Sequence, residues 1–177
     1  MRVVAKFGGT SLGSGDRVER AAASIARAVE AGHEVAVVAS AMGSTTDDLL
    51  SEITFEADDR DRAEIVSMGE RTAVRLLKAA LAARGIDAVF LEPGSNEWPI
   101  VANDLGEVDA EATTERSRAL ADRLDAVVPV VTGFLAQNHE GEVTTLGRGG
   151  SDTTAVMLGR YIDADEVVIV TDVEGVM

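Results

Sequence analysis

Lys6 is one of only two lysines in the chain, and its neighbours are of the types that would let it act on a phosphate. It belongs to the apolar run 3–7, and Gly8 and Gly9 follow that run directly. Glycine lets the backbone approach a ligand closely, and the N–H groups of such a turn can point at phosphate oxygens. A lysine ammonium beside the turn supplies a compact positive charge for a phosphoryl group in transfer. The alternative is an ordinary strand and turn, with the lysine side chain extending into water.

A second glycine-rich segment, residues 145–152, has the sequence TLGRGGSD and leads into a predicted helix. Backbone N–H groups at the start of a helix can hold an anion. Arg148 can bind a carboxylate through two parallel hydrogen bonds. Asp152, in the first helical turn, either orients a lysine or a metal ion or only adds the negative charge that a helix start favours.

Glu70 follows a glycine inside a long predicted helix, in the segment SMGE at 67–70. Glycine in the middle of a helix lowers stability by about 1 kcal/mol relative to alanine, so close packing or the approach of a ligand is the expected reason. Glu70 is then suited to accept a hydrogen bond from a substrate ammonium. The alternative is a glutamate on the solvent face.

Two further polar segments follow predicted strands. One contains Ser40, Ser44 and Thr46, whose hydroxyls could contact a ligand, although Thr46 or Ser44 could instead be only the N-cap of a helix. The other contains Thr171 and Asp172, where the aspartate could bind a ribose hydroxyl or form an Asx-turn. Neither a GxxxxGK[ST] nor a GxGxxG sequence occurs, which excludes a P-loop and removes the main sequence argument for a dinucleotide site.

Strand and helix patterns alternate, and they predict an α/β fold with a mainly parallel sheet and helices on both faces, a three-layer αβα arrangement. Strands are expected over 3–7, 34–39, 86–91, 126–132 and 166–171, and a hairpin over 134–146. Helices are expected over 17–31, around 49–53, from the charged stretch 58–62 to 84, over 112–125 and over 151–161. Ligands bind beyond the carboxyl ends of such strands, and all the polar segments after strands would therefore meet at one edge of the sheet.

Composition restricts the function classes. The 177 residues suit one domain. A net charge of −15 argues against nucleic acid and anionic membranes as partners, and 3% aromatic residues leave few platforms for base stacking. With no cysteine and two well-separated histidines, expected to be exposed, we predict no metal site built from these residues. No signal peptide or membrane span is visible, so we expect a cytoplasmic protein, and the excess of acidic residues favours a high-salt cytoplasm.

Taken in order, six motifs resemble those of the aspartokinases, which belong to the amino acid kinase family. They are VVAKFGGTSL, SAMGSTTDDLL, VSMGER, PVVTGF, TTLGRGGSDTTA and TDVEGV, and they run through essentially the whole chain. KFGGTS together with GRGGSD is a specific pair, and SMGE between them strengthens it. Acetylglutamate kinase, glutamate 5-kinase and uridylate kinase share the fold and a leading lysine but are less similar at the glycine loops.

The resemblance implies transfer of the γ-phosphoryl group of ATP, with Mg²⁺, to the β-carboxylate of L-aspartate, a step toward lysine, threonine and methionine. The implied catalytic residues are Lys6, which would neutralise charge in the transition state, and Asp152, which would organise Lys6 or the Mg²⁺-bound phosphates. The implied ATP-binding residues are Lys6, Gly8, Gly9, Thr171 and Asp172. The implied aspartate-binding residues are Ser40, Thr46, Glu70, Arg148, Gly149, Gly150 and Ser151. A homo-oligomer is also expected.

The chain departs from the family in two places. Trp98 and Pro99 stand where the family usually has a small residue and a glycine. Family members also continue beyond the position of Met177, so residues 1–177 are expected to be the N-terminal part of a catalytic domain, without its remainder or the regulatory ACT domains. A related kinase with another carboxylate acceptor, or a truncated non-catalytic module that binds an amino acid, are the alternatives.

Overall fold

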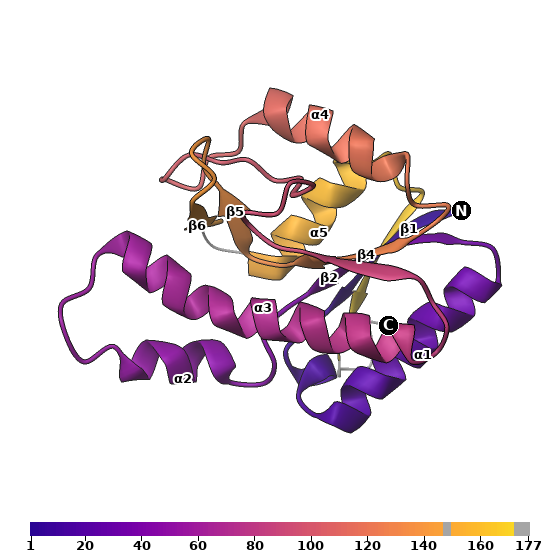
Figure 1. The fold of residues 1–177 in the computed structure, drawn as a ribbon, viewed down its shortest axis with the longest axis horizontal. Coiled ribbons are helices and arrows are strands. Elements are labelled where there is room, and N and C mark those ends of the chain that lie inside the picture. Colours follow the sequence, from indigo (N-terminus) through magenta and orange to yellow (C-terminus); the bar gives the residue numbers. More distant parts are fainter. Residues whose placement is uncertain (147–149, 172–177) are drawn as a thin grey trace, which may run out of the picture.

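A computed structural model describes residues 1–146 and 150–171 of the chain (Figure 1). Its main sheet has five parallel strands in the order β3-β4-β2-β1-β7. The strands are β1 (Arg2–Phe7), β2 (Glu34–Ala39), β3 (Ala88–Leu91), β4 (Val128–Thr132) and β7 (Glu166–Val170). A separate antiparallel hairpin consists of β5 (Leu135–Gln137) and β6 (Val143–Thr145). The predicted parallel sheet and hairpin are confirmed.

Helices cover both faces of the sheet. They are α1 (Gly15–Glu30), α2 (Thr45–Glu52), α3 (Asp59–Ala82), α4 (Ala110–Ala121) and α5 (Gly150–Tyr161), with a short 3₁₀ turn, η1 (Thr10–Leu12). Figure 1 shows α1 and α3 on one side of the sheet and α4 and α5 on the other. The predicted three-layer αβα arrangement is confirmed.

Alternation of side chains along the strands produces two apolar cores. In β2, Ala36 and Val38 pack in the core beneath α4 and α5, whereas Val35 and Val37 pack in the core beneath α1 and α3. Both faces of each strand are therefore apolar, which explains the continuous hydrophobic runs in the sequence.

Side-chain caps account for two of the helix starts that differ from prediction. The Ser14 hydroxyl accepts a hydrogen bond from the backbone N–H of Arg17, so α1 begins at Gly15 rather than 17. The Asp109 carboxylate accepts from the N–H groups of Glu111 and Ala112, so α4 begins at Ala110 rather than 112. Periodicity marks the apolar face of a helix, but the cap decides where the helix begins.

Trp98 belongs to the core and not to an exposed loop. Its side chain is fully buried, and Nε1 donates a hydrogen bond to the carbonyl of Ile100 at 2.6 Å. The surrounding segment has no long strand, but Ala102 pairs with Val108 in an antiparallel bridge and Val101 pairs with Gln137 of β5. The Trp98–Pro99 departure from the family pattern therefore contributes packing beneath α4 and α5.

Connections leave the sheet in different directions at β2 and β4. The chain leaves β2 toward α2 and α3, and it leaves β4 toward the hairpin and α5. Such a point, between adjacent strands whose connections go to opposite faces, is where parallel α/β sheets form ligand crevices. Among the described residues, no helix combines the length and the apolarity that a membrane crossing would need.

Candidate active site

Lys6 lies near the carboxyl end of β1 and forms an ion pair with α5. Its Nζ is 2.8 Å from Oδ1 of Asp152, and the Lys6 side chain is only 12% exposed. Because Lys6 points to the same face as Val4, which packs against α5, strand alternation directs the ammonium to the first turn of that helix. The alternative of a lysine that extends freely into water is thus wrong.

The turn at Gly8 and Gly9 packs directly against the loop after β2. The N–H of Gly43 donates to the carbonyl of Gly9 at 2.9 Å, and a Cβ on Gly9 would lie 2.8 Å from the carbonyl oxygen of Ala41. On Gly8, a Cβ would lie 3.4 Å from Nζ of Lys6. A group bound by the Lys6 ammonium would therefore also be beside the glycine backbone, which is the geometry a phosphate needs.

Glu70 is buried, and only one of its two carboxylate oxygens has a hydrogen-bond partner among the described residues. It is 4% exposed; its Oε1 accepts a hydrogen bond from the N–H of Ala41 at 3.4 Å, and its Oε2 has no partner among the described residues. Burial raises the pKa of Glu70 from 4.5 to about 7, opposed by backbone hydrogen bonds. The solvent-face alternative is therefore wrong, and the free oxygen is suited to a cationic group.

Gly69 allows α3 to reach this loop. A Cβ on Gly69 would lie 2.7 Å from the Cβ of Ala41 and 3.5 Å from the methyl group of Thr45. The prediction that close packing explains the glycine inside this helix is confirmed.

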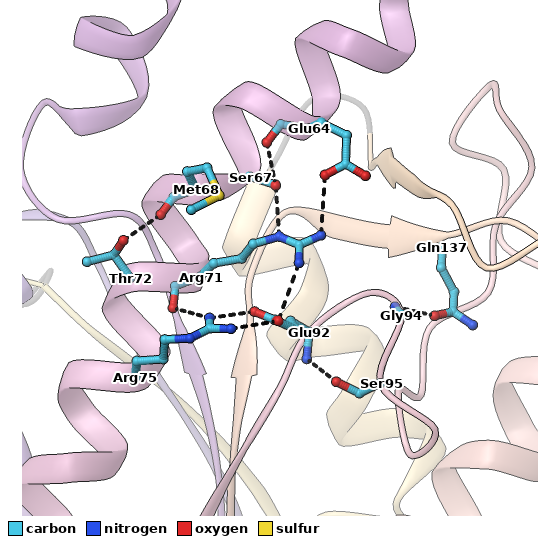
Figure 2. A network of polar contacts seen from close by, with 10 residues as sticks. All are labelled: Glu64, Ser67, Met68, Arg71, Thr72, Arg75, Glu92, Gly94, Ser95 and Gln137. Carbon is cyan, nitrogen blue, oxygen red and sulfur yellow. Dashed lines mark hydrogen bonds and ion pairs between the residues drawn. The ribbon is translucent and has the colours of Figure 1, made fainter.

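A network of charged side chains fixes the same part of α3 to the end of β3 (Figure 2). The Glu92 carboxylate accepts two hydrogen bonds from Arg75, at 2.6 and 2.8 Å, and lies 3.3 Å from Arg71. Arg71 also donates to Ser67 Oγ at 2.9 Å, and the Arg75 guanidinium lies 4.4 Å from the ring centre of Phe90. Because Arg71 follows Glu70 directly, this network holds the helical turn that carries Glu70. Sequence analysis missed it, since an arginine and a glutamate far apart in the chain give no pairing signal.

The hydroxyls predicted to contact substrate lie around the same loop. Ser40 is half-buried, and its N–H donates to the carbonyl of Phe7 at 3.1 Å. Thr46 is half-buried in the first turn of α2, so it is not the N-cap. Ser44 occupies the N-cap position without a capping bond from its side chain, which instead donates to Asp48 at 2.9 Å.

Gly133, which follows β4 and lies in the PVVTGF motif, is a contact residue to which sequence analysis assigned no role. A Cβ at this position would lie 2.3 Å from Oγ of Ser151, so only glycine lets the end of β4 meet the start of α5. The next residue, Phe134, has a φ of 65° that is rare outside glycine, and its N–H donates to Thr154 Oγ1 at 2.9 Å. A glycine after a strand suits any turn, so the motif alone did not indicate this contact.

Some of the remaining predicted residues lie within the described part of the chain, and the others lie outside it. Gly150 is the first residue of α5, Ser151 and Asp152 lie in its first turn, and Thr171 follows β7 in an exposed position. The glycine turn lies beside that strand, because the N–H of Gly8 points to the carbonyl of Val170 at 3.5 Å. Arg148, Gly149 and Asp172 lie outside the described residues.

A cavity of about 660 Å³ lies between the hairpin and the start of α3, and among the described residues Thr46 is the predicted site residue that lines it. Thr46, Val66, Phe134 and Thr145 contribute to its lining. Within the described ranges, no group of three His, Asp or Glu side chains is arranged to hold a metal ion. An ammonium beside a glycine turn and a buried carboxylate thus lie at one sheet edge, a combination that suits an anionic group and a small cationic group together.

Comparisons with known proteins agree with this geometry. The family model of the amino acid kinase family matches residues 1–177. The chain is 40% identical to an aspartate kinase of Pseudomonas putida and 38% identical to aspartokinase 2 of Bacillus subtilis, with 98% of this chain and 43% of each relative covered. It therefore spans less than half the length of these curated relatives.

Solved structures give the same result. An aspartate kinase from Synechocystis superimposes with a TM-score of 0.78 at 35% identity, covering 97% of this chain and 28% of that one. Aspartokinase III of E. coli, solved in complex with aspartate and ADP, superimposes with a TM-score of 0.84 at 27% identity, covering 99% of this chain and 50% of that one. Since the family model extends over residues 1–177 and the fold superimposes on those structures, the chain belongs to the amino acid kinase family.

Proposed function

We propose that the protein to which this chain belongs is an aspartate kinase, which transfers the γ-phosphoryl group of ATP to the β-carboxylate of L-aspartate. The observation that carries the proposal is the meeting of Lys6 and Glu70 at one sheet edge, on two sides of the loop after β2. The names of the relatives support the same reaction. One edge then has a positive group for phosphate and a negative group for the substrate ammonium.

The ATP side of the site consists of Lys6, Gly8, Gly9, Thr171 and Asp172. Lys6 contacts the phosphoryl group in transfer, and Asp152 orients Lys6 through the 2.8 Å ion pair. Asp152, whose side chain is 59% exposed beside Lys6, would be the residue to approach a Mg²⁺ ion, which would neutralise phosphate charge when bound with ATP.

The aspartate side consists of Ser40, Thr46, Glu70, Arg148, Gly149, Gly150 and Ser151. Glu70 receives the ammonium at its free oxygen, and Arg148 receives the α-carboxylate. Ser40 and Thr46 direct the β-carboxylate toward the phosphate.

The reaction needs no strong general base. An oxygen of the β-carboxylate, already ionised at neutral pH, attacks the γ-phosphorus, the bond to the oxygen between the β- and γ-phosphates breaks, and ADP leaves with that electron pair. Catalysis then depends on alignment and on neutralising charge, which is what a fixed ammonium and backbone N–H groups supply.

Several broader features belong to the same proposal. Residues 1–177 are the N-terminal part of the catalytic domain, and the complete enzyme is a cytoplasmic homo-oligomer. It makes the acyl phosphate from which lysine, threonine and methionine derive. The charge of −15 further supports a host cytoplasm with a high salt concentration.

The test uses the longest gene product that contains this sequence. It is incubated with Mg-ATP and L-aspartate, L-glutamate or succinate, and the acyl phosphate is trapped with hydroxylamine. We expect hydroxamate with L-aspartate at a rate well above the other two acceptors. Equal rates with L-glutamate would indicate a related kinase, and aspartate binding without ATP binding would indicate a non-catalytic module.

A further inference from the structure

Two buried polar atoms without partners lie at the site. Among the described residues, the buried side-chain atoms with no hydrogen-bond partner are Glu70 Oε2, Thr132 Oγ1, Ser117 Oγ and His33 Nδ1. Buried polar groups are nearly always paired, and an unpaired one lowers stability, so each invites an explanation. The proposed function explains the unpaired oxygen of Glu70, because that oxygen would bind the substrate ammonium. The unpaired hydroxyl of Thr132, the last residue of β4 at the crevice, has no explanation yet.

Thr132 and Glu70 face the same layer of the molecule. Strand alternation directs Thr132 to the side of Val130, which packs in one core with Ala73 and Val74 of α3. Glu70 lies about one helical turn before those two residues, toward the end of α3 that is nearer the cavity. The two unpaired oxygens thus occupy the same interlayer space at the carboxyl ends of the strands.

Backbone contacts bring them closer still. Thr132 pairs with Ala39 in the sheet, and the N–H of Gly133 donates to the carbonyl of Ala39 at 2.9 Å. Two residues after Ala39, the N–H of Ala41 donates to Glu70. A short path across the end of β2 therefore joins the two residues.

Neighbours of both residues in the sequence line the cavity. Val66, one turn before Glu70 on α3, contributes to its lining, and so does Phe134, two residues after Thr132. Both unpaired oxygens are hydrogen-bond acceptors, and an ammonium has three N–H donors and no acceptor. A small molecule that enters the cavity with its ammonium first would satisfy them both.

We propose that Thr132 is a binding residue for the substrate ammonium, which it shares with Glu70, and that it thereby selects α-amino acids over dicarboxylates without an amino group. This inference rests on the proposed function and gives a role to a residue of the PVVTGF motif to which the resemblance assigned none. A site with buried polar groups rejects an analogue that leaves them unpaired much more strongly than an apolar pocket rejects a misfit.

The deciding variant is Thr132→Val in the longest gene product, because valine keeps nearly the same shape without the hydroxyl. If the hydroxyl serves only the ligand, the ligand-free protein should melt at the same temperature or higher. The KM for L-aspartate should rise by about tenfold or more, with kcat within about twofold. The KM for ATP should not change, and the preference for L-aspartate over succinate should narrow.

Two variants complete the experiment. Thr132→Ser restores a hydroxyl and should restore the KM for L-aspartate. Ser117→Ala removes a buried unpaired hydroxyl of the same kind on α4, away from the cavity lining, and should leave every kinetic constant unchanged.

Each other outcome overturns the inference. An unchanged KM for L-aspartate in Thr132→Val, with an active parent enzyme, would overturn it and leave the proposed function intact. A lower melting temperature with no rescue by serine would make Thr132 a structural residue. A parent protein that neither binds nor phosphorylates L-aspartate would overturn the proposed function and this inference together.

Discussion

Lys6 and Glu70 illustrate how differently two charged residues can be buried. The Lys6 ammonium has a counter-charge at 2.8 Å, on an aspartate that remains accessible to water. Glu70 has no positively charged partner among the described residues and one unpaired oxygen. The Lys6 ammonium is therefore positioned to bind an anion. The buried Glu70 carboxylate is energetically unfavourable as it stands, and a bound cation would stabilise it.

Lys6→Ala should abolish phosphoryl transfer while the fold remains. We expect kcat/KM to fall by at least about 100-fold, because a charge that acts in the transition state is lost. The partner Asp152 is 59% exposed, so the ion pair contributes at most about 1 kcal/mol to stability. Activity and thermal unfolding of the longest gene product measure the two effects separately.

The chain offers a matched control for this variant. Lys78, the other lysine, lies on α3 and is half-buried. Lys78→Ala removes one positive charge as well and should retain full activity. Equal losses in the two variants would contradict a specific role for Lys6.

Ionisation of Glu70 should appear in both stability and binding. Its pKa is raised from 4.5 to about 7, so between these values the folded protein keeps a proton that the unfolded chain has lost. The favourable contribution is present below about pH 4.5 and is lost as the pH rises through 7. Relative to Glu70→Gln, the free energy of unfolding should therefore fall by about 3 kcal/mol between pH 4.5 and 8.

Protonation of Glu70 favours the folded state but weakens the binding of the substrate. A protonated Glu70 cannot attract an ammonium, so the KM for L-aspartate should rise as the pH falls below about 7. In Glu70→Gln the KM should be higher throughout and lose this pH dependence. Parallel pH profiles for the two proteins would contradict the assignment.

At the scale of elements, close contacts between glycines and neighbouring backbone assemble the site. The glycine turn after β1, the loop after β2, the middle of α3 and the start of α5 meet at positions where a methyl group would not fit. These contacts join segments far apart in the chain. They explain why polar residues from four segments reach one edge.

Gly69→Ala should test this at one contact. Alanine usually favours a helix, but here its Cβ would lie 2.7 Å from the Cβ of Ala41, which has no flexible side chain to move aside. We expect a loss of about 1–3 kcal/mol in unfolding free energy, together with weaker aspartate binding. Chemical denaturation and calorimetry measure the two quantities.

Gly15→Ala is the corresponding control. Gly15 begins α1, and nothing lies within 4 Å of where its Cβ would be. This substitution should be neutral or stabilise by up to about 1 kcal/mol. If Gly69→Ala proved as stable as Gly15→Ala, the contact with Ala41 would not limit the packing of α3.

At the scale of the whole molecule, the excess of negative charge opposes folding. The net charge of −15 comes from 31 acidic and 16 basic residues in 177. Self-repulsion of this kind opposes the compact state and weakens as salt screens it. Burial of two apolar cores has to exceed this repulsion.

Added KCl should therefore stabilise the chain. Between about 0.02 and 0.3 M, where screening changes most, we expect the melting temperature to rise by roughly 5 °C or more. Differential scanning calorimetry at constant pH measures it. A flat curve over this range would contradict both the repulsion argument and the proposed high-salt host.

Much of the fold was predictable because the evidence for it is local. Apolar runs bounded by glycines identify the strands, and alternation with helical periodicity leaves few arrangements other than a parallel sheet covered on both faces. The helix starts at Ser14 and Asp109 were less accurate, since a cap is a single side-chain contact. The burial of Trp98 was not predictable from the sequence, because it depends on α4 and α5, which come later in the chain.

Site residues of a type that is unusual at their position could be predicted from the sequence. Site residues of an ordinary type could not. A lysine in a lysine-poor chain and a glycine before Glu70 both gave a signal. Thr132 and Gly133 lie in the PVVTGF motif, but no role could be assigned to them, because their importance lies in what they face across the sheet. The Arg71–Glu92 contact likewise depends on the packing of α3 beside β3.

The loop after β2 joins the two halves of the site. Through Gly43 it bonds to the glycine turn that would receive ATP, and through Ala41 it bonds to the carboxylate that would receive aspartate. A displacement of this loop by one ligand changes the free energy with which the other binds, and thermodynamic linkage makes the effect equal in both directions. The two substrates should accordingly bind with mutual synergy or antagonism, with Ala41 and Gly43 as the residues through which the coupling passes.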